Sequence, residues 1–193
     1  MKRMKLILVL MSAFLSMYGQ KVDLIGEDVT FKLDAKHVET TAVLSLRSNS
    51  GFDLSQVMFV PMPLRKEGLL RDTLIIFDIT RNNPITHTRS QPAGLFFSVP
   101  FGPNEQKKLR ISYIDDHNGK YFMYPMKMQA GYWQGMLSSA GYTLRYDENV
   151  VVIDSTSMTP DGTEKTDTGT ILSWKRSKFT PLSEFEVWFH LKK

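Results

Sequence analysis

The sequence has 193 residues, of which 42% are hydrophobic and 23% charged, and it contains no cysteine. The missing cysteines exclude disulfide bonds, thiol catalysis, cysteine-ligated zinc and lipid attachment to an N-terminal cysteine. The formal net charge is +4, but no stretch gathers the basic residues into the clustered face that nucleic-acid binding requires, so we expect no nucleic-acid partner.

Residues 1–19 have the order of a secretory signal peptide. Lys2, Arg3 and Lys5 precede an apolar run from Leu6 to Phe14, and small residues precede Gln20. The apolar run is shorter than the roughly 20 residues that a membrane-spanning helix needs. We therefore expect a periplasmic or secreted protein whose mature chain does not span the membrane and is not a lipoprotein.

Removal of this segment leaves residues 20–193, which suit a single domain. Three of the 24 basic residues lie in the segment, so 21 basic residues remain against 20 acidic ones. The mature chain is therefore expected to be nearly neutral, with a net charge of +1.

The remaining sequence alternates apolar and polar residues in short runs that end at Gly, Pro or Asn. A period of two predicts strands that are buried on one face. The runs, in chain order, are residues 29–34, 42–47, 57–60, 73–79, 95–99, 109–114, 121–124, 141–146, 150–153, 170–174 and 185–191.

These runs predict an all-β fold of about eight to ten strands. We expect an antiparallel β-sandwich, immunoglobulin-like or jelly-roll-like, and a barrel is the second choice. Asn118 and Gly119 predict a hairpin between residues 109–114 and 121–124 because this pair adopts positive φ in tight turns. Trp174 and Trp188 lie within apolar alternation and are expected in the core.

Asp115, Asp116 and Asn118 form the densest polar cluster, and their oxygens are of the kind that Ca²⁺ prefers. The same residues are common in turns for backbone reasons alone, and we favour the turn. The sequence has no His-Glu-x-x-His, no Gly-x-Ser-x-Gly and no phosphate-binding loop. We therefore expect no cofactor and no enzymatic activity, and a hydrolase with scattered catalytic residues stays open as an alternative.

Aromatic residues gather between positions 121 and 133. Tyr121, Tyr124, Tyr132 and Trp133 could stack on a sugar ring or anchor a protein partner if they are exposed. Core packing is the competing interpretation, because aromatic side chains are mostly buried.

Several phrases resemble known exported proteins. The segment Val99–Glu105, followed by Leu109–Tyr113, resembles a strand–turn–strand element of the N-terminal β-domain of gluzincin aminopeptidases. Residues 133–137 and 174–181 resemble an uncharacterised family of exported β-sandwich proteins, and the signal peptide resembles those of the Bacteroidota. The resemblance implies an exported all-β fold and carries over no catalytic residue, since the zinc-binding motif is missing and the chain leaves no room for a catalytic domain.

Together these patterns predict a non-enzymatic β-sandwich protein of the cell envelope that acts through protein–protein contacts, its partner being another envelope or secreted protein. A carbohydrate-binding module that uses exposed aromatic residues is the first alternative, and the hydrolase is the second.

Overall fold

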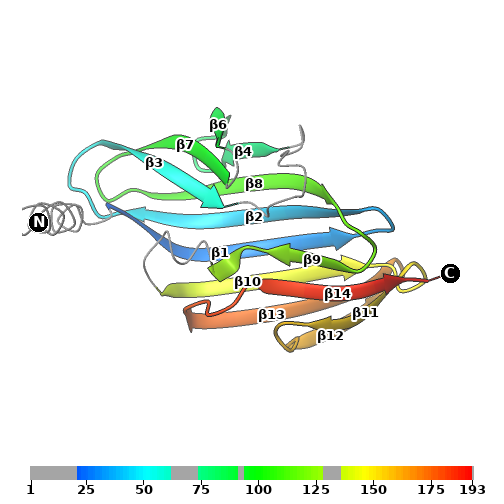
Figure 1. Ribbon diagram of the computed structural model, residues 1–193. Helices are drawn as coiled ribbons and strands as arrows, with labels where there is room; N and C mark the ends of the chain where they lie inside the picture. The colour runs from blue at the N-terminus through cyan, green and yellow to red at the C-terminus, as the bar shows by residue number, and fades with distance from the viewer. Residues whose placement is uncertain (1–20, 62–73, 91–93, 128–135, 193) are drawn as a thin grey trace, which may run out of the picture.

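The computed structural model describes residues 21–61, 74–90, 94–127 and 136–192, and strands are their main element (Figure 1). The predicted signal peptide lies outside these ranges. Eight strands form one large sheet in the order β12-β13-β10-β1-β2-β8-β4-β5. Their bounds are β1 Val22–Leu33, β2 His37–Ser48, β4 Ile75–Asp78, β5 Asn83–Pro84, β8 Gln106–Asp116, β10 Leu137–Tyr146, β12 Gly162–Thr166 and β13 Gly169–Phe179.

Two three-stranded sheets pack on one side of the large sheet, which we call its inner face. One has the order β11-β14-β9 and the other β3-β7-β6. Their bounds are β3 Leu54–Pro61, β6 His87–Ser90, β7 Gly94–Phe101, β9 Tyr121–Tyr124, β11 Val151–Thr156 and β14 Phe185–Leu191. In Figure 1, β9 and β14 run alongside β1 and β10, whereas β3 and β7 lie toward β8. The predicted all-β sandwich is confirmed.

The core lies between the large sheet and the two small ones. Alternation along β1 turns Phe31 and Leu33 inward, while Thr30 and Lys32 face the opposite side. The Phe31 ring stacks on Phe185 of β14 with 5.1 Å between the centroids. Trp174 of β13 meets the same Phe185 ring edge-on at 5.0 Å. Through these contacts β14 packs against the centre of the large sheet. The buried position predicted for Trp174 is confirmed.

Strand number and direction differ from the sequence prediction. The described residues contain 14 strands, of which β5, β6 and β12 lie outside every predicted run. β1 pairs with β10 in parallel and with β2 in antiparallel, so the large sheet is mixed rather than purely antiparallel. A strand's own sequence does not indicate the direction of its neighbour, and β1 and β10 are far apart in the chain.

The predicted hairpin between residues 109–114 and 121–124 is wrong. Gly119 does adopt a positive φ of 75°, but β8 already pairs with β2 on one side and β4 on the other. The chain therefore crosses to the small sheet, where β9 pairs with β14. There Phe122 and Tyr124 of β9 pack against Phe31. Among the described residues, no helix has the length and apolar character needed to cross a membrane.

Candidate functional site

The outer face of the large sheet is the side that neither small sheet covers. A row of hydroxyl side chains runs straight across five neighbouring strands of this face, each residue being the register partner of the next: Ser173, Thr143, Thr30, Thr41 and Ser112. Thr41 and Ser112 are also hydrogen-bonded to each other, with 3.2 Å between their oxygens. Small hydroxyl groups leave this part of the sheet flat and polar.

Three shallow hollows follow the seam between β1 and β10 on the outer face. One of about 430 Å³ lies beside Gly26 and Ser139, and one of about 340 Å³ lies beside Thr30 and Thr143. The largest, about 810 Å³, lies at the end of the seam, where Lys32 and Arg145 line it. We call this last hollow the seam-end hollow.

Lys32 and Arg145 are direct neighbours in the parallel β1–β10 register. Both side chains are exposed on the outer face, because the residues that alternate with them, Leu33 and Leu144, are buried. Residues directly opposite on one face of a sheet have Cβ atoms roughly 5 Å apart, and like charges there are destabilising. Glu39 is the register partner of Lys32 on β2, yet neither cation forms an ion pair among the described residues.

Two carboxylates at the rim of the seam-end hollow are engaged by the backbone. Asp34 Oδ1 accepts the N–H groups of Lys36 at 2.7 Å and His37 at 2.8 Å. Partial burial alone would raise the pKa of Asp34, but these two hydrogen bonds and the nearby histidines outweigh it and lower the pKa. Asp147 Oδ1 accepts the N–H of Asn149 at 2.8 Å. Both acids thus shape turns at the edge of the hollow.

A second surface with distinct chemistry lies on the exposed side of the β11-β14-β9 sheet. The Trp188 and Tyr121 rings are register partners with centroids 5.6 Å apart and planes inclined by 46°. The Tyr121 hydroxyl donates to Glu186 Oε1 at 2.8 Å. Burial and this carboxylate together raise the pKa of Tyr121 to about 12. Trp188 is 38% exposed, so the core position expected for it is wrong.

The predicted contact aromatics do not form one group. Tyr121 is half-buried on the surface just described. Tyr124 is buried and donates to Glu27, so it offers no surface to a partner. Tyr132 and Trp133 lie outside the described residues. Trp188, which the sequence placed in the core, is exposed instead, and its polar neighbours Glu186 and His190 on the same face are the signal that could have indicated this.

The predicted polar cluster lies at the crossing from β8 to β9. Asp116 Oδ1 lies 3.3 Å from His37 Nε2, and Asn118 Oδ1 accepts the N–H of Lys120 at 3.1 Å. Asp115, at the end of β8, is the register partner of Val38. Across the described parts of the chain, no three His, Asp or Glu side chains gather as a metal site would require.

Glu27 is a carboxyl group in the core. Glu27 follows a bulge between Leu24 and Gly26 of β1 and is in phase with the inward residues Val29 and Phe31, so only 3% of it is exposed. The hydroxyls of Tyr142 and Tyr124 both donate to its carboxylate. Burial raises the pKa of Glu27 to about 7, and the two tyrosine hydrogen bonds only partly oppose that effect. The carboxyl joins β1 and β10 to β9 of the small sheet.

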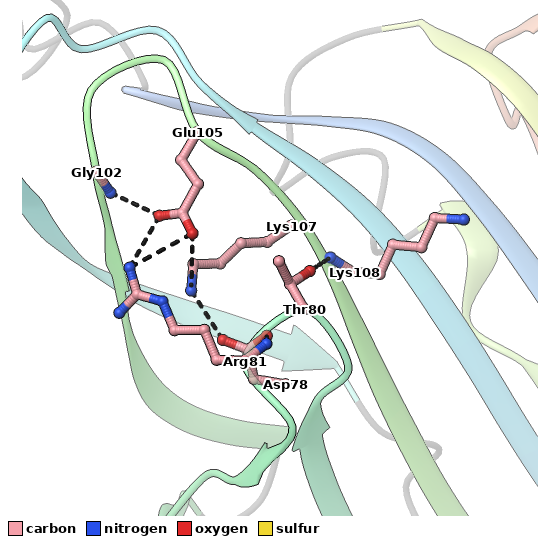
Figure 2. Close-up of polar contacts among 7 residues, drawn as sticks. All are labelled: Asp78, Thr80, Arg81, Gly102, Glu105, Lys107 and Lys108. Carbon is pink, nitrogen blue, oxygen red and sulfur yellow. Dashed lines mark hydrogen bonds and ion pairs between the residues drawn. The ribbon is translucent and has the colours of Figure 1, made fainter.

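A buried ion-pair cluster links the β7–β8 turn to the turn after β4 (Figure 2). Lys107 Nζ, with none of its side chain exposed, lies 2.8 Å from Asp78 Oδ2 and 3.4 Å from Glu105 Oε1. Glu105 also accepts the Gly102 N–H at 2.6 Å and pairs with Arg81 at 3.0 Å. Two cations and two anions balance inside the cluster, so it has no charge left for a ligand and is structural.

No protein-family model matches this sequence, and neither does any curated protein. Among solved structures, the chain is similar to a "putative nutrient binding protein" from Legionella pneumophila. That likeness has a TM-score of 0.65 and 10% sequence identity, and covers 88% of this chain and 67% of that chain. The chain is also similar to an M1 zinc metallopeptidase from Deinococcus radiodurans. There the TM-score is 0.50 at 10% identity, covering 88% of this chain and 42% of that chain.

These likenesses concern the fold alone, because 10% identity does not carry residue roles. The chain spans about two thirds of the Legionella protein and less than half of the metallopeptidase. The resemblance to an aminopeptidase β-domain, noted from short sequence phrases, therefore agrees with a likeness of fold.

Proposed function

We propose that this chain is an exported, non-enzymatic binding domain that contacts a partner protein through the outer face of the eight-stranded sheet. The observation that carries the proposal is the hollowed outer face, which neither small sheet covers and whose central row consists of five hydroxyl side chains. Short hydroxyl side chains lose little conformational freedom when a partner covers them, and each can donate or accept a hydrogen bond.

The charges of this face favour a partner with an acidic surface. Its exposed cations include Lys32, Lys108, Arg145 and Lys175, against the exposed acids Asp28 and Glu39. Complementary potential across an interface steers association and excludes wrong partners.

Site-specific photo-crosslinking tests the proposal. A photoreactive phenylalanine analogue in place of Thr143, at the centre of the outer face, should crosslink a single protein in cells that produce the chain. The matched position is His190, which is exposed on the β11-β14-β9 sheet and should crosslink little. Crosslinks at position 190 alone, or a strict monomer without crosslinks at position 143, would contradict the proposal.

Carbohydrate binding is the second candidate function, and the exposed Trp188 ring beside Tyr121 and Glu186 favours it. Sugar rings stack on exposed aromatic faces while carboxylates accept hydrogen bonds from the sugar hydroxyl groups. Trp188→Ala should weaken retardation in gels containing soluble β-glucan or xylan at least about tenfold, as loss of an aromatic anchor does. Leu182→Ala is the control, since Leu182 is exposed and lies outside this surface. Equal mobility of wild type and Trp188→Ala would remove this candidate.

A further inference from the structure

We propose that the seam-end hollow is an anion-binding site that accepts a carboxylate or phosphate group between Lys32 and Arg145. The proposal deepens the proposed function and rests on it, because Lys32 and Arg145, two exposed cations of the outer face, line the hollow. The shared ligand chemistry is a compact anionic group. It could come from a free metabolite or from an acidic side chain of the partner.

Two like charges are held close together at the hollow. The parallel register makes Lys32 and Arg145 direct neighbours, and their exposed positions on β1 and β10 turn both toward the hollow. Such a pair costs stability in the free protein. An anion bound between Lys32 and Arg145 offsets their repulsion. The two side chains therefore interact more favourably with a bound anion than with water.

The charged side chains that line the hollow do not balance. Lys32, Lys36 and Arg145 supply three positive charges, against two negative charges from Asp34 and Asp147. Both acids already accept backbone N–H groups in their turns. The cations have no such partners among the described residues. The lining therefore keeps a net positive charge, and its cationic side chains are available to a ligand.

The size and the hydrogen-bonding groups of the hollow suit a small anion. Its volume of about 810 Å³ lies within the range of small-molecule sites. Thr168 adds a hydroxyl donor to the lining. The Arg145 guanidinium presents a planar fork that matches a carboxylate or phosphate with two parallel hydrogen bonds.

The test measures binding of citrate, inorganic phosphate and a hexaglutamate peptide to the purified full chain by isothermal titration calorimetry at low salt. At least one of these probes should bind the wild type. Arg145→Gln and Lys32→Gln should each weaken that binding at least about tenfold, the usual cost of one charge-assisted hydrogen bond. Arg145→Lys keeps the positive charge without the planar guanidinium fork, so it should lose less affinity than Arg145→Gln. Lys175→Gln removes a cation elsewhere on the outer face and should change the affinity less than about twofold.

The three probes separate the possible sources of the anion. Binding of citrate or phosphate assigns the hollow to a free anion, and binding of the peptide alone assigns it to acidic side chains of a partner. Absence of binding by all three, or an equal loss in Lys175→Gln, would overturn the proposal. If no anion binds but the photoreactive residue at position 143 still crosslinks a protein, the proposed function stands without this anion site.

Thermal unfolding gives a second measurement. If the two cations merely stabilised the fold, removing one of them would not raise the Tm. Arg145→Gln relieves the repulsion and leaves Lys32 beside its acidic register partner Glu39, so it should raise the Tm of the free protein by about 1–3 °C. A fall in Tm for Arg145→Gln would show that this cation stabilises the fold, which contradicts a repulsion between the two cations.

Discussion

Replacing Lys107 with methionine should lower the free energy of unfolding by about 3–5 kcal/mol. The Lys107 ammonium is wholly buried between Asp78 and Glu105 (Figure 2), and methionine fills a similar volume without the charge. Asp78 is itself only 2% exposed, so its carboxylate would be left in the interior without its cation. Urea unfolding followed by the fluorescence of the buried Trp174 measures the effect.

The double variant Lys107→Met/Asp78→Asn separates loss of charge from loss of packing. The introduced asparagine keeps an oxygen for the Arg81 N–H that Asp78 Oδ1 now accepts at 3.0 Å, and it leaves no buried charge facing the methionine. The double variant should therefore recover at least half of the stability that Lys107→Met loses. Strictly additive losses would show that the two side chains do not act as a pair.

Lys165→Met is the matched control for an ion pair in solvent. Lys165 Nζ lies 3.1 Å from Glu148 Oε1, but 74% of the lysine side chain is exposed. Exposed pairs of this kind contribute about 0–1 kcal/mol. If Lys107→Met lowers the free energy of unfolding no more than Lys165→Met does, burial does not strengthen the ion pairs of Lys107. Another contact must then hold the two turns together.

Alternation in the sequence predicts which residues face the core within a strand. Along β1, the expected inward set Val29, Phe31 and Leu33 is buried. The inward face expected for residues 42–47, made by Ala42, Leu44 and Leu46, is buried as well. These predictions hold because a strand turns successive side chains to opposite faces whatever its partners are.

Pairing between strands could not be predicted in the same way. The seam-end hollow exists because β1 and β10 are parallel neighbours, and nothing near Lys32 in the sequence indicates Arg145 as its register partner. The hairpin prediction failed for a related reason: the turn chemistry at Gly119 is local, whereas the edges of β8 are occupied by distant strands. The hydroxyl row across five strands is likewise visible only after assembly.

In the two remaining cases, alternation places a residue against the preference of its type. Trp188 shares its face with Glu186 and His190, while Phe185, Val187 and Phe189 fill the core side of β14. Trp188 is therefore exposed although it is a large aromatic residue. Glu27 is in phase with the inward residues Val29 and Phe31 on β1, so its carboxyl group lies in the core.

Wild-type stability should fall between about pH 4.5 and pH 7 through the titration of Glu27. Burial raises the pKa of the folded-state carboxyl from 4.5 to about 7. Below pH 4.5 both the folded and the unfolded chain hold this proton, and the group contributes nothing to the pH dependence. As the pH rises toward 7, the unfolded chain releases the proton and the folded chain keeps it, so unfolding becomes more favourable.

Glu27→Gln removes this titration and isolates its contribution. The unfolding free energy of Glu27→Gln, relative to the wild type, should rise by about 3 kcal/mol between pH 4.5 and pH 7 and then level off. The difference between wild type and Glu27→Gln is needed because other carboxylates change the stability with pH in the opposite direction. The pKa values of Asp34 and Glu105 are lowered in the fold, and their stabilisation is lost as the pH falls. Urea unfolding of both proteins at half-unit intervals of pH gives the difference directly.

Tyr142→Phe tests the cause of the shift. The Tyr142 hydroxyl donates to Glu27 and lowers its pKa against the larger effect of burial. Its removal should move the upper end of the transition above pH 7 without changing the lower end, which the unfolded chain sets. A stability difference between wild type and Glu27→Gln that stays flat from pH 4.5 to 7.5 would mean that Glu27 ionises in the folded protein as easily as in the unfolded chain. In that case the contact with the two tyrosines, rather than burial, would control the carboxyl group.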